Sequence, residues 1–231
     1  MKKIILFLFI IPLTILGQKY QQPDLVNLID AEYSEMGSNF PEFGLIGWSK
    51  DGLFAYREIL SDGGIGTYVD NIIIHNLKND EIVESFSFSI SDEHDGIEYP
   101  PGNSPWEYFQ RSINRLLSKY EIIQAYSNKF YTEKYIDKYE IIIKNRTSTC
   151  EWEYEYEHEY RLLVGNSKTG YKKVGDGLLG CGSSSMKFEG YFKSPFENRI
   201  IIILSSYTLG YESEEDWKLH FFGCSLDPRT F

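Results

Sequence analysis

The sequence predicts a mainly β fold with antiparallel sheets, arranged either like propeller blades or as a two-sheet sandwich, and with one amphipathic α-helix in mid-chain. Three observations predict it. Many short segments alternate apolar and polar residues, an Asp-Gly turn separates the first two, and one stretch combines helix-capping residues with apolar spacings of three and four. No low-complexity linker divides the chain. We therefore expect residues 18–231 to form a single β-rich domain.

Four strands are predicted in the first part of this domain, at residues 45–48, 53–59, 68–75 and 82–89. Asp51-Gly52 separates the first two, and glycine tolerates the positive φ that a tight hairpin turn requires. In the fourth segment Phe86, Phe88 and Ile90 alternate with serines, which indicates one buried and one wet face. Four antiparallel strands in about 45 residues match the size of one propeller blade.

The helix is predicted from Ser104 to about Lys119. Ser104 is a favourable N-cap, Pro105 suits the first helical position, and Glu107 completes a capping box. Six apolar residues then recur at spacings of three and four, at positions 106, 109, 113, 116, 117 and 120. That stripe is typical of a helix with one face against a core.

Strands return in the second half of the chain, at residues 135–144, 150–164, 171–174, 186–192, 199–206 and 217–226. The second of these is long and alternating, and a Gly-Asn-Ser-Lys-Thr-Gly turn at residues 165–170 follows it. The run from Ile200 to Leu204 is the longest apolar stretch after the N-terminus, and its length suits a strand.

Residues 1–17 are typical of a cleavable signal peptide. Lys2 and Lys3 precede an apolar run of about 13 residues, shorter than the roughly 20 that span a bilayer. Pro12 interrupts the run, and Gly17 supplies a small residue before the expected cleavage at Gln18. We therefore expect a secreted or periplasmic protein with no stable membrane span after cleavage; the alternative is a retained single-span anchor.

The charge of the chain disfavours two classes of partner. Loss of residues 1–17 removes two lysines and changes the formal net charge from −11 to −13. Nucleic-acid binding relies on clustered Lys and Arg, so no nucleic-acid partner is expected. Anionic membrane surfaces are disfavoured for the same reason.

Two segments carry a resemblance to known families. Residues 48–56, Trp-Ser-Lys-Asp-Gly-Leu-Phe-Ala-Tyr, resemble the opening strands of blades in TolB-type propellers. Residues 190–195, 199–204 and 210–212 are similar to a later segment of a family of predicted secreted bacterial proteins of unknown function, although Phe196-Glu197 replaces the Asp-Gly turn of that pattern. The resemblance implies a blade-like fold and export, and it implies no activity.

The candidate ligand-binding residues are the aromatic ones of residues 151–160, where five glutamates alternate with Trp152, Tyr154, Tyr156, His158 and Tyr160. On one long strand, the glutamates would share one face and the aromatic rings the other. Our main interpretation is a solvated acidic face above an aromatic face packed in the core. In the alternative, Trp152, Tyr154, Tyr156 and Tyr160 form an exposed platform for a sugar or peptide, or the carboxylates attract cations.

Other motifs give no catalytic residue, metal site or cofactor. The acid-rich loop at residues 92–96 lacks the spacing of a dedicated calcium loop, and the four histidines stand singly. The loop at residues 180–185 does not match a nucleophile motif. Two of Cys150, Cys181 and Cys224 are expected to pair in an oxidising compartment. Sequence does not determine which, and we favour Cys181 with Cys224 because both follow a glycine.

These observations predict an exported, non-catalytic binding or scaffolding domain whose partner is a protein or a glycan. The alternative is an extracellular hydrolase that cleaves a polymer through a pair of carboxylates, since glycoside hydrolysis needs two acids. An enzyme would bring two acids together in a pocket with raised pKa values, whereas a binding module would show an aromatic patch or groove.

Overall fold

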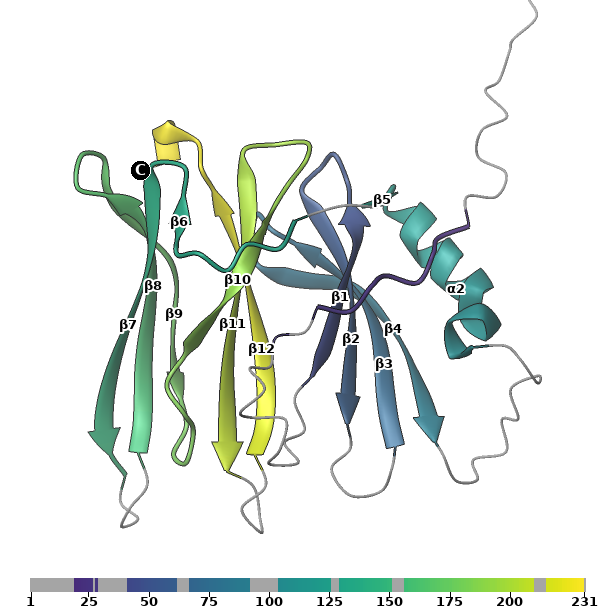
Figure 1. Cartoon of the computed structure of the whole chain (residues 1–231), viewed down its shortest axis with the longest axis horizontal. Helices are drawn as coiled ribbons and strands as arrows, with labels where there is room; N and C mark the ends of the chain where they lie inside the picture. The colour runs from purple at the N-terminus through teal and green to yellow at the C-terminus, as the bar shows by residue number, and fades with distance from the viewer. Residues whose placement is uncertain are drawn as a thin grey trace, which may run out of the picture.

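The computed structural model describes residues 19–26, 28, 41–61, 67–91, 104–125, 129–150, 156–209 and 215–230. These residues form three antiparallel sheets and one α-helix (Figure 1). The prediction of a mainly β fold with antiparallel sheets and one helix in mid-chain is therefore confirmed. No helix in the described part of the chain has the length and apolar character needed to cross a membrane.

Sheet A has the strand order β4-β3-β2-β1-β5 and contains the four strands predicted first. Its strands are β1 (Glu42–Trp48), β2 (Leu53–Ser61), β3 (Thr67–Asn76), β4 (Glu81–Ser91) and β5 (Ile123–Gln124). Gly52 in the β1–β2 turn has φ +86°, the left-handed conformation for which its sequence position was singled out. The two-residue strand β5 was not predicted, and it pairs with the end of β1.

Sheets B and C come from the second half of the chain. Sheet B has the order β10-β11-β12, and sheet C has the order β6-β7-β8-β9. Their strands are β6 (Tyr135–Ile136), β7 (Tyr139–Thr149), β8 (Tyr156–Asn166), β9 (Gly170–Leu179), β10 (Lys187–Lys193), β11 (Arg199–Leu209) and β12 (Glu215–Ser225). A 3₁₀ turn at Pro228–Thr230 follows.

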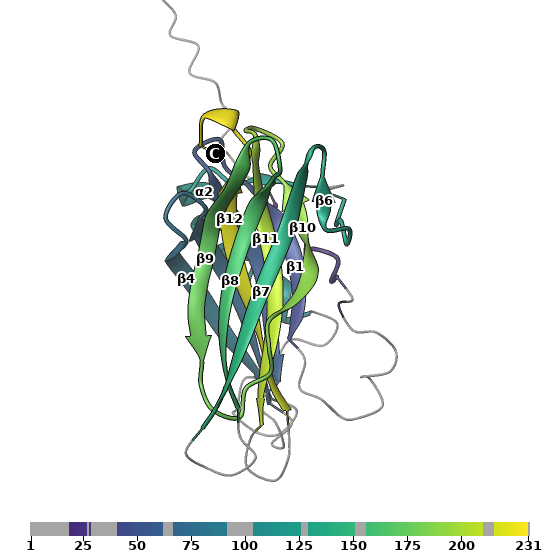
Figure 2. The same cartoon turned by 90° about the vertical axis from the view of Figure 1, so that its left-hand side faces the viewer.

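The three sheets stack face to face in the order A, B, C, and the helix α2 (Pro105–Lys119) covers the outer face of sheet A (Figure 1). Three apolar clusters fill the spaces between these layers. One joins α2 to sheet A, the second joins sheets A and B, and the third joins sheets B and C. The strands of all three sheets run nearly along one direction (Figure 2). The arrangement is thus a stack of three blade-like sheets.

Sheet B is the middle layer, and its central strand β11 explains the apolar run noted in the sequence. Ile200, Ile202 and Leu204 face sheet C, whereas Ile201 and Ile203 face sheet A. All five side chains are fully buried. A strand with both faces covered has no wet side, so its sequence is continuously apolar instead of alternating.

The helix begins where the capping residues place it. The Ser104 Oγ accepts a hydrogen bond from the Glu107 N–H, and the Glu107 carboxylate accepts one from the Ser104 N–H, at 3.3 and 3.0 Å. Trp106, Ile113, Leu116 and Leu117 are buried against sheet A, and Phe109 is partly buried there. The predicted capping box and apolar stripe are therefore confirmed.

We expect Ser104→Ala to lower the free energy of unfolding by about 1 kcal/mol, because the Glu107 N–H loses the Ser104 Oγ as its acceptor at an exposed helix end. Urea denaturation followed by circular dichroism measures the change. Ser112→Ala, in the exposed middle of the same helix, serves as the control and should not be destabilising. Equal losses in both variants would contradict a specific capping role.

One predicted strand is wrong in its extent. Residues 150–164 were predicted as a single strand, but β7 ends at Thr149 and β8 begins at Tyr156, and these two residues are paired with each other. Residues 151–155 lie outside the described part of the chain. Strand β9 is longer than the predicted residues 171–174.

Candidate functional site

The segment after the predicted signal peptide is bound to the domain by buried contacts. We call residues 19–26 the N-terminal strap. Tyr20 is almost fully buried between α2 and sheet A, and its hydroxyl donates to the Ile122 carbonyl at 2.7 Å. Its backbone N–H donates to Asn114 Oδ1 on α2 at 3.2 Å. The strap therefore closes the end of the cluster that joins the helix to the sheet.

The strap continues along the margin of sheet A that β1 and β5 form. The Gln124 side chain accepts from the Gln21 N–H and donates to the Gln21 carbonyl, both at 2.9 Å. Further along, the Val26 N–H donates to the Phe43 carbonyl of β1 at 2.6 Å. These backbone contacts fix the course of the strap beside the sheet.

A pocket of about 310 Å³ lies between the strap and the margins of sheets A and B. Gln21, Gln22, Pro23, Asp24, Leu25 and Val26 line it from the strap, and Leu45, Gln124, Ala125, Phe130 and Phe192 line it from the rest of the domain. The rings of Phe130 and Phe192 contact each other with centroids 5.0 Å apart. The pocket thus combines an aromatic and aliphatic wall with the amide groups and the carboxylate of the strap.

This combination suits recognition of a small ligand or of one residue of a larger one. Ligand sites have volumes of about 300–1,000 Å³, and a few polar groups beside apolar walls orient what binds. Asp24 is exposed and supplies the single formal charge among the described lining residues, so it favours a cation or a hydrogen-bond donor. Gly44 lets the strap approach β1, because a Cβ there would lie 2.9 Å from the Asp24 carbonyl oxygen.

Sequence reasoning missed this site. Residues 18–43 contain two prolines and no strand-length alternation, so no element was predicted there. The available signal was the presence of Tyr20, Leu25 and Val26 within this polar segment. Tyr20 bonds to Ile122, 102 positions away in the chain, and the periodicity of a sequence carries no information about such contacts.

Of the four predicted aromatic ligand residues, the structure describes Tyr156 and Tyr160. Tyr160 lies in the cluster between sheets B and C, 8% exposed, with its ring 6.1 Å from that of Phe222. Tyr156, on the same face of β8, is 50% exposed. Trp152 and Tyr154 lie outside the described residues. The core interpretation therefore holds for Tyr160, and truncation of Tyr156 is expected to cost less than that of a buried ring.

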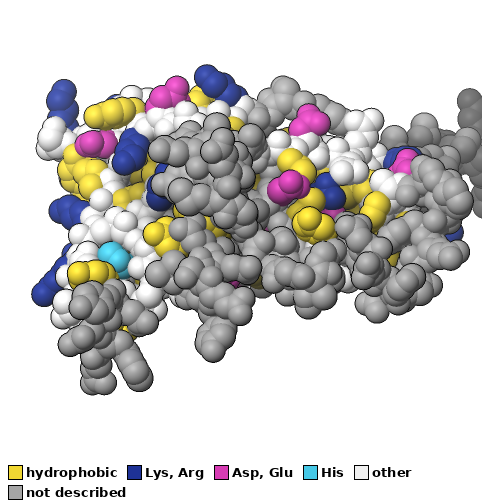
Figure 3. All heavy atoms as spheres, turned by 60° about the horizontal axis from the view of Figure 1, so that its bottom comes forward, with side chains coloured by type: hydrophobic (Ala, Val, Ile, Leu, Met, Phe, Trp, Pro, Cys, Tyr) yellow, Lys and Arg dark blue, Asp and Glu magenta, His cyan; other side chains and the backbone are white. Residues whose placement is uncertain are grey.

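The acidic face of this strand points to solvent, as predicted for residues 157 and 159. Glu159 stands opposite Arg146 of β7, and Arg161 follows it on the same face. Figure 3 shows Lys and Arg side chains gathered at the sheet C end of the molecule. One basic residue of β7 and one of β8 thus lie beside Glu159.

The disulfide joins Cys150 to Cys181, and the predicted pairing of Cys181 with Cys224 is wrong. Cys150 follows β7 and Cys181 follows β9, so both lie at the same end of sheet C. Cys224 is buried between sheets B and C, and burial raises the pKa of its thiol to about 11. Because Cys181 is oxidised, it is not a nucleophile.

Glu58 is the acid whose environment most resembles that of a catalytic carboxyl. Burial raises its pKa to about 7, and no second carboxylate among the described residues contributes to that shift. The neighbouring Tyr56 is also buried, and its hydroxyl has a raised pKa because of burial and of Glu58.

We expect Glu58→Gln to stabilise the protein at pH 8 and to leave its stability nearly unchanged at pH 4. A carboxyl whose pKa rises on folding favours the folded state below its unfolded pKa of about 4.5, and this advantage disappears as the pH rises through about 7. Such a shift corresponds to about 3 kcal/mol. Urea denaturation from pH 4 to pH 8 measures it.

Glu159→Gln is the matched control for that series, because the Glu159 side chain is exposed in the folded protein. Its unfolding free energy should follow that of the wild type at every pH. A wild-type pH profile that Glu58→Gln leaves unaltered would contradict the assignment.

Ser206 and His220 are another pair of polar residues that the structure brings together. Ser206 Oγ and His220 Nε2 are 2.9 Å apart, but Ser206 is buried and no carboxylate in the described part of the chain is bonded to His220. Burial, and secondarily Lys218, lower the pKa of His220. No group of three His, Cys, Asp or Glu residues that could hold a metal ion occurs among the described residues. The acid-rich loop at residues 92–96 lies outside them.

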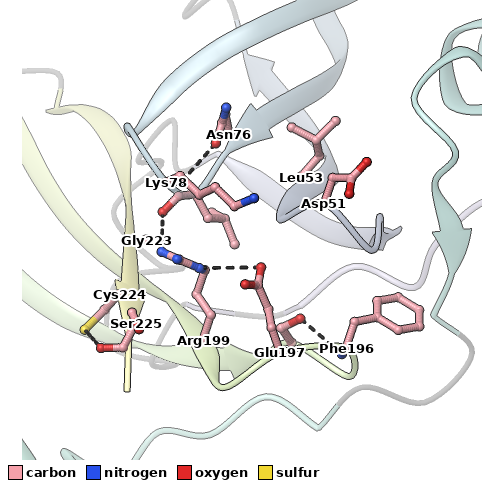
Figure 4. A network of polar contacts seen from close by, with 12 residues as sticks. Asp51, Leu53, Asn76, Lys78, Phe196, Glu197, Arg199, Gly223, Cys224 and Ser225 are labelled. Atoms are coloured by element: carbon pink, nitrogen blue, oxygen red, sulfur yellow. Dashed lines mark hydrogen bonds and ion pairs between the residues drawn. The ribbon is translucent and has the colours of Figure 1, made fainter. Parts of the chain in front are cut away.

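A polar junction connects sheets A and B at the end where Gly52 lies. Arg199 Nη1 donates to the Leu77 carbonyl at 2.9 Å, and its Nε lies 3.5 Å from Glu197 Oε1. Figure 4 shows the Arg199 side chain between the turn that carries Lys78 and Glu197. A Cβ at Gly52 would lie 2.7 Å from Glu197 Oε1, so glycine is needed for space as well as for its φ. The Glu197 carboxylate and the Arg199 guanidinium carry opposite charges that neutralise each other, which indicates a structural role.

Comparison with known proteins does not assign the chain to a group. The resemblance to TolB-type blades and to a secreted family therefore stays a prediction. No protein-family model, no curated protein and no solved structure matches this chain, so its own residues are what bear on its function.

Proposed function

We propose that this protein is an exported, non-catalytic binding domain and that its ligand site is the pocket beneath the N-terminal strap. The observation that carries the proposal is the pocket itself, in which strap amides and the Asp24 carboxylate face Leu45, Phe130 and Phe192. Such a site recognises a compact group with one apolar face and hydrogen-bond donors on the other. A glycan residue or a peptide side chain has this character.

Two features support export. Cys150 and Cys181 form a disulfide, and disulfides persist in oxidising compartments outside the cytosol. Tyr20 stands two residues after the expected new N-terminus at Gln18 and is packed in the core. Cleavage before Gln18 would therefore remove the signal sequence and leave the strap intact.

The binding proposal is tested with an array of extracellular glycans and short peptides, followed by calorimetry on each hit. Asp24→Asn removes the pocket charge, and Leu25→Ala removes an exposed lining side chain, with little expected effect on folding. Each should weaken binding about tenfold, the effect of losing about 1.4 kcal/mol. Asp216→Asn, an exposed acid on β12, should leave the affinity unchanged. Hits that bind all variants equally would place the site elsewhere.

We expect the protein isolated from its native cell to lack residues 1–17. Its intact mass should equal that of a chain starting at Gln18, with an allowance of two hydrogens for the disulfide and of the mass lost if the terminal glutamine cyclises. Protein recovered in membranes with the mass of the full-length chain would contradict cleavage and favour a retained anchor.

A further inference from the structure

Strand β4 lies at the margin of sheet A opposite the strap. In the order β4-β3-β2-β1-β5 it pairs with β3 on one side, and no strand of the described chain pairs with its other side. Figure 2 places β4 at the left margin of the stack, whereas β1 and β10 lie toward the right. One row of β4 backbone groups therefore faces away from the sheet along a strand of eleven residues.

The second part of β4, from Ser85 to Ser91, lacks the features that protect edge strands from pairing. Ser85 to Ser91 contains no charge, no proline and no glycine, and the bulge in its pairing with β3 lies before it, at Ile74/His75. Strand β9, at one edge of sheet C, is different. It carries two lysines, an aspartate and two internal glycines, and it has a bulge in its pairing with β8. Exposed edges that are long, uncharged and regular are the ones that accept another strand.

The sequence of β4 is also complementary to itself. Ser85-Phe86-Ser87-Phe88-Ser89 reads the same in both directions about Ser87. In an antiparallel pair centred there, Ser87 stands opposite Ser87, and Phe86 stands opposite Phe88. The three serines are exposed on one face of the sheet. Phe86 and Phe88 lie on the face that α2 covers, and both contact Phe109.

We propose that β4 pairs antiparallel with β4 of a second copy of this chain, about a two-fold axis at Ser87, and joins the two five-stranded sheets. In this register Glu84 meets residue 90 of the other copy, so no acid opposes an acid within residues 83–91 of β4, despite the net charge of −11. Phe86, partly exposed in one copy, gains an aromatic cross-strand neighbour. The two copies present the same surface, as a closed dimer requires.

Cysteine cross-linking tests the register. Ser87→Cys chains should form a covalent dimer under mild oxidation, because directly opposed residues have Cα atoms about 4.5–5.5 Å apart, within the range of a disulfide. Ser85→Cys alone should not, since the two copies of residue 85 would be about 13 Å apart along the strands. A mixture of Ser85→Cys and Ser89→Cys chains should cross-link again. Equal cross-linking of all single variants, or none for Ser87→Cys, would overturn the proposal.

Light scattering coupled to size exclusion tests association without cysteines. The wild type should elute with twice the chain mass, and Ser87→Lys, which places two charges across the axis, should elute as a monomer with an unchanged circular dichroism spectrum. Ser148→Lys, at an exposed serine of β7, should remain dimeric. A monomeric wild type at its highest soluble concentration, or a dimeric Ser87→Lys, would overturn the proposal. Neither outcome bears on the strap pocket, which lies at the other margin.

Discussion

Asp70→Asn is expected to destabilise the protein by about 3–5 kcal/mol, because it leaves the Arg57 guanidinium buried without its counter-charge. Arg57 Nε donates to both carboxylate oxygens of Asp70 at 2.9 Å, and Nη2 donates to Oδ2 at 2.5 Å. The two side chains are 6% and 0% exposed. The Arg57 guanidinium also lies 5.8 Å from the ring centroid of Trp106 on α2, so the pair supports the contact between helix and sheet.

A double-mutant cycle separates the cost of an unpaired charge from the value of the pair. Arg57→Leu combined with Asp70→Leu should recover most of the loss, since an apolar pair of similar volume avoids burying charge. Urea denaturation measures the free energy of unfolding of the wild type, of Arg57→Leu, of Asp70→Leu and of the double variant. Asp176→Asn, which breaks the exposed ion pair with Lys173, is the control and should cost less than about 1 kcal/mol. A small loss in Asp70→Asn would show that Arg57 reaches water or another acceptor.

Removal of the Cys150–Cys181 disulfide should lower the free energy of unfolding by about 4 kcal/mol, the loop-closure value for cysteines 31 residues apart. The bridge connects the ends of β7 and β9 across sheet C, so its loss frees a long segment of the unfolded chain. Cys150→Ala with Cys181→Ala measures this in thermal and urea denaturation. A reductant should lower the melting temperature of the wild type by a similar amount.

The thiol chemistry provides the controls for that prediction. The reductant should not affect the double variant, because Cys224 has no partner to lose. Peptide mapping without reduction should recover residues 150 and 181 in one linked fragment. A linked fragment containing Cys224 would restore the pairing first expected from the sequence and contradict the structure.

Local chemistry was sufficient to predict several elements. The helix start depends on Ser104, Pro105 and Glu107, whose contacts all lie within one turn, and the β1–β2 hairpin depends on the φ that Gly52 can adopt. Strands in both halves followed from alternation or from apolar runs, because each strand reports its own burial at every second residue. These features need no knowledge of where distant residues lie.

Other features required the tertiary structure because they depend on contacts between residues far apart in the sequence. The alternation of residues 150–164 predicted one strand, yet pairing of Thr149 with Tyr156 makes a hairpin, since period-two alternation does not reveal where a chain reverses. The partner of Cys181 followed from the pairing order of sheet C and not from a shared glycine.

The sequence by itself determined that this protein is mainly β, where its helix begins, and which strand is apolar on both faces. Only the tertiary structure decided that three sheets stack, that Tyr20 and the strap close the core, and that a pocket lies between the strap and the sheets. The physical reason is the separation, along the chain, of the residues that interact. Turns, caps and periodicity are set by neighbours in the chain, whereas a pocket is set by which surfaces meet, and that depends on the burial of the whole fold.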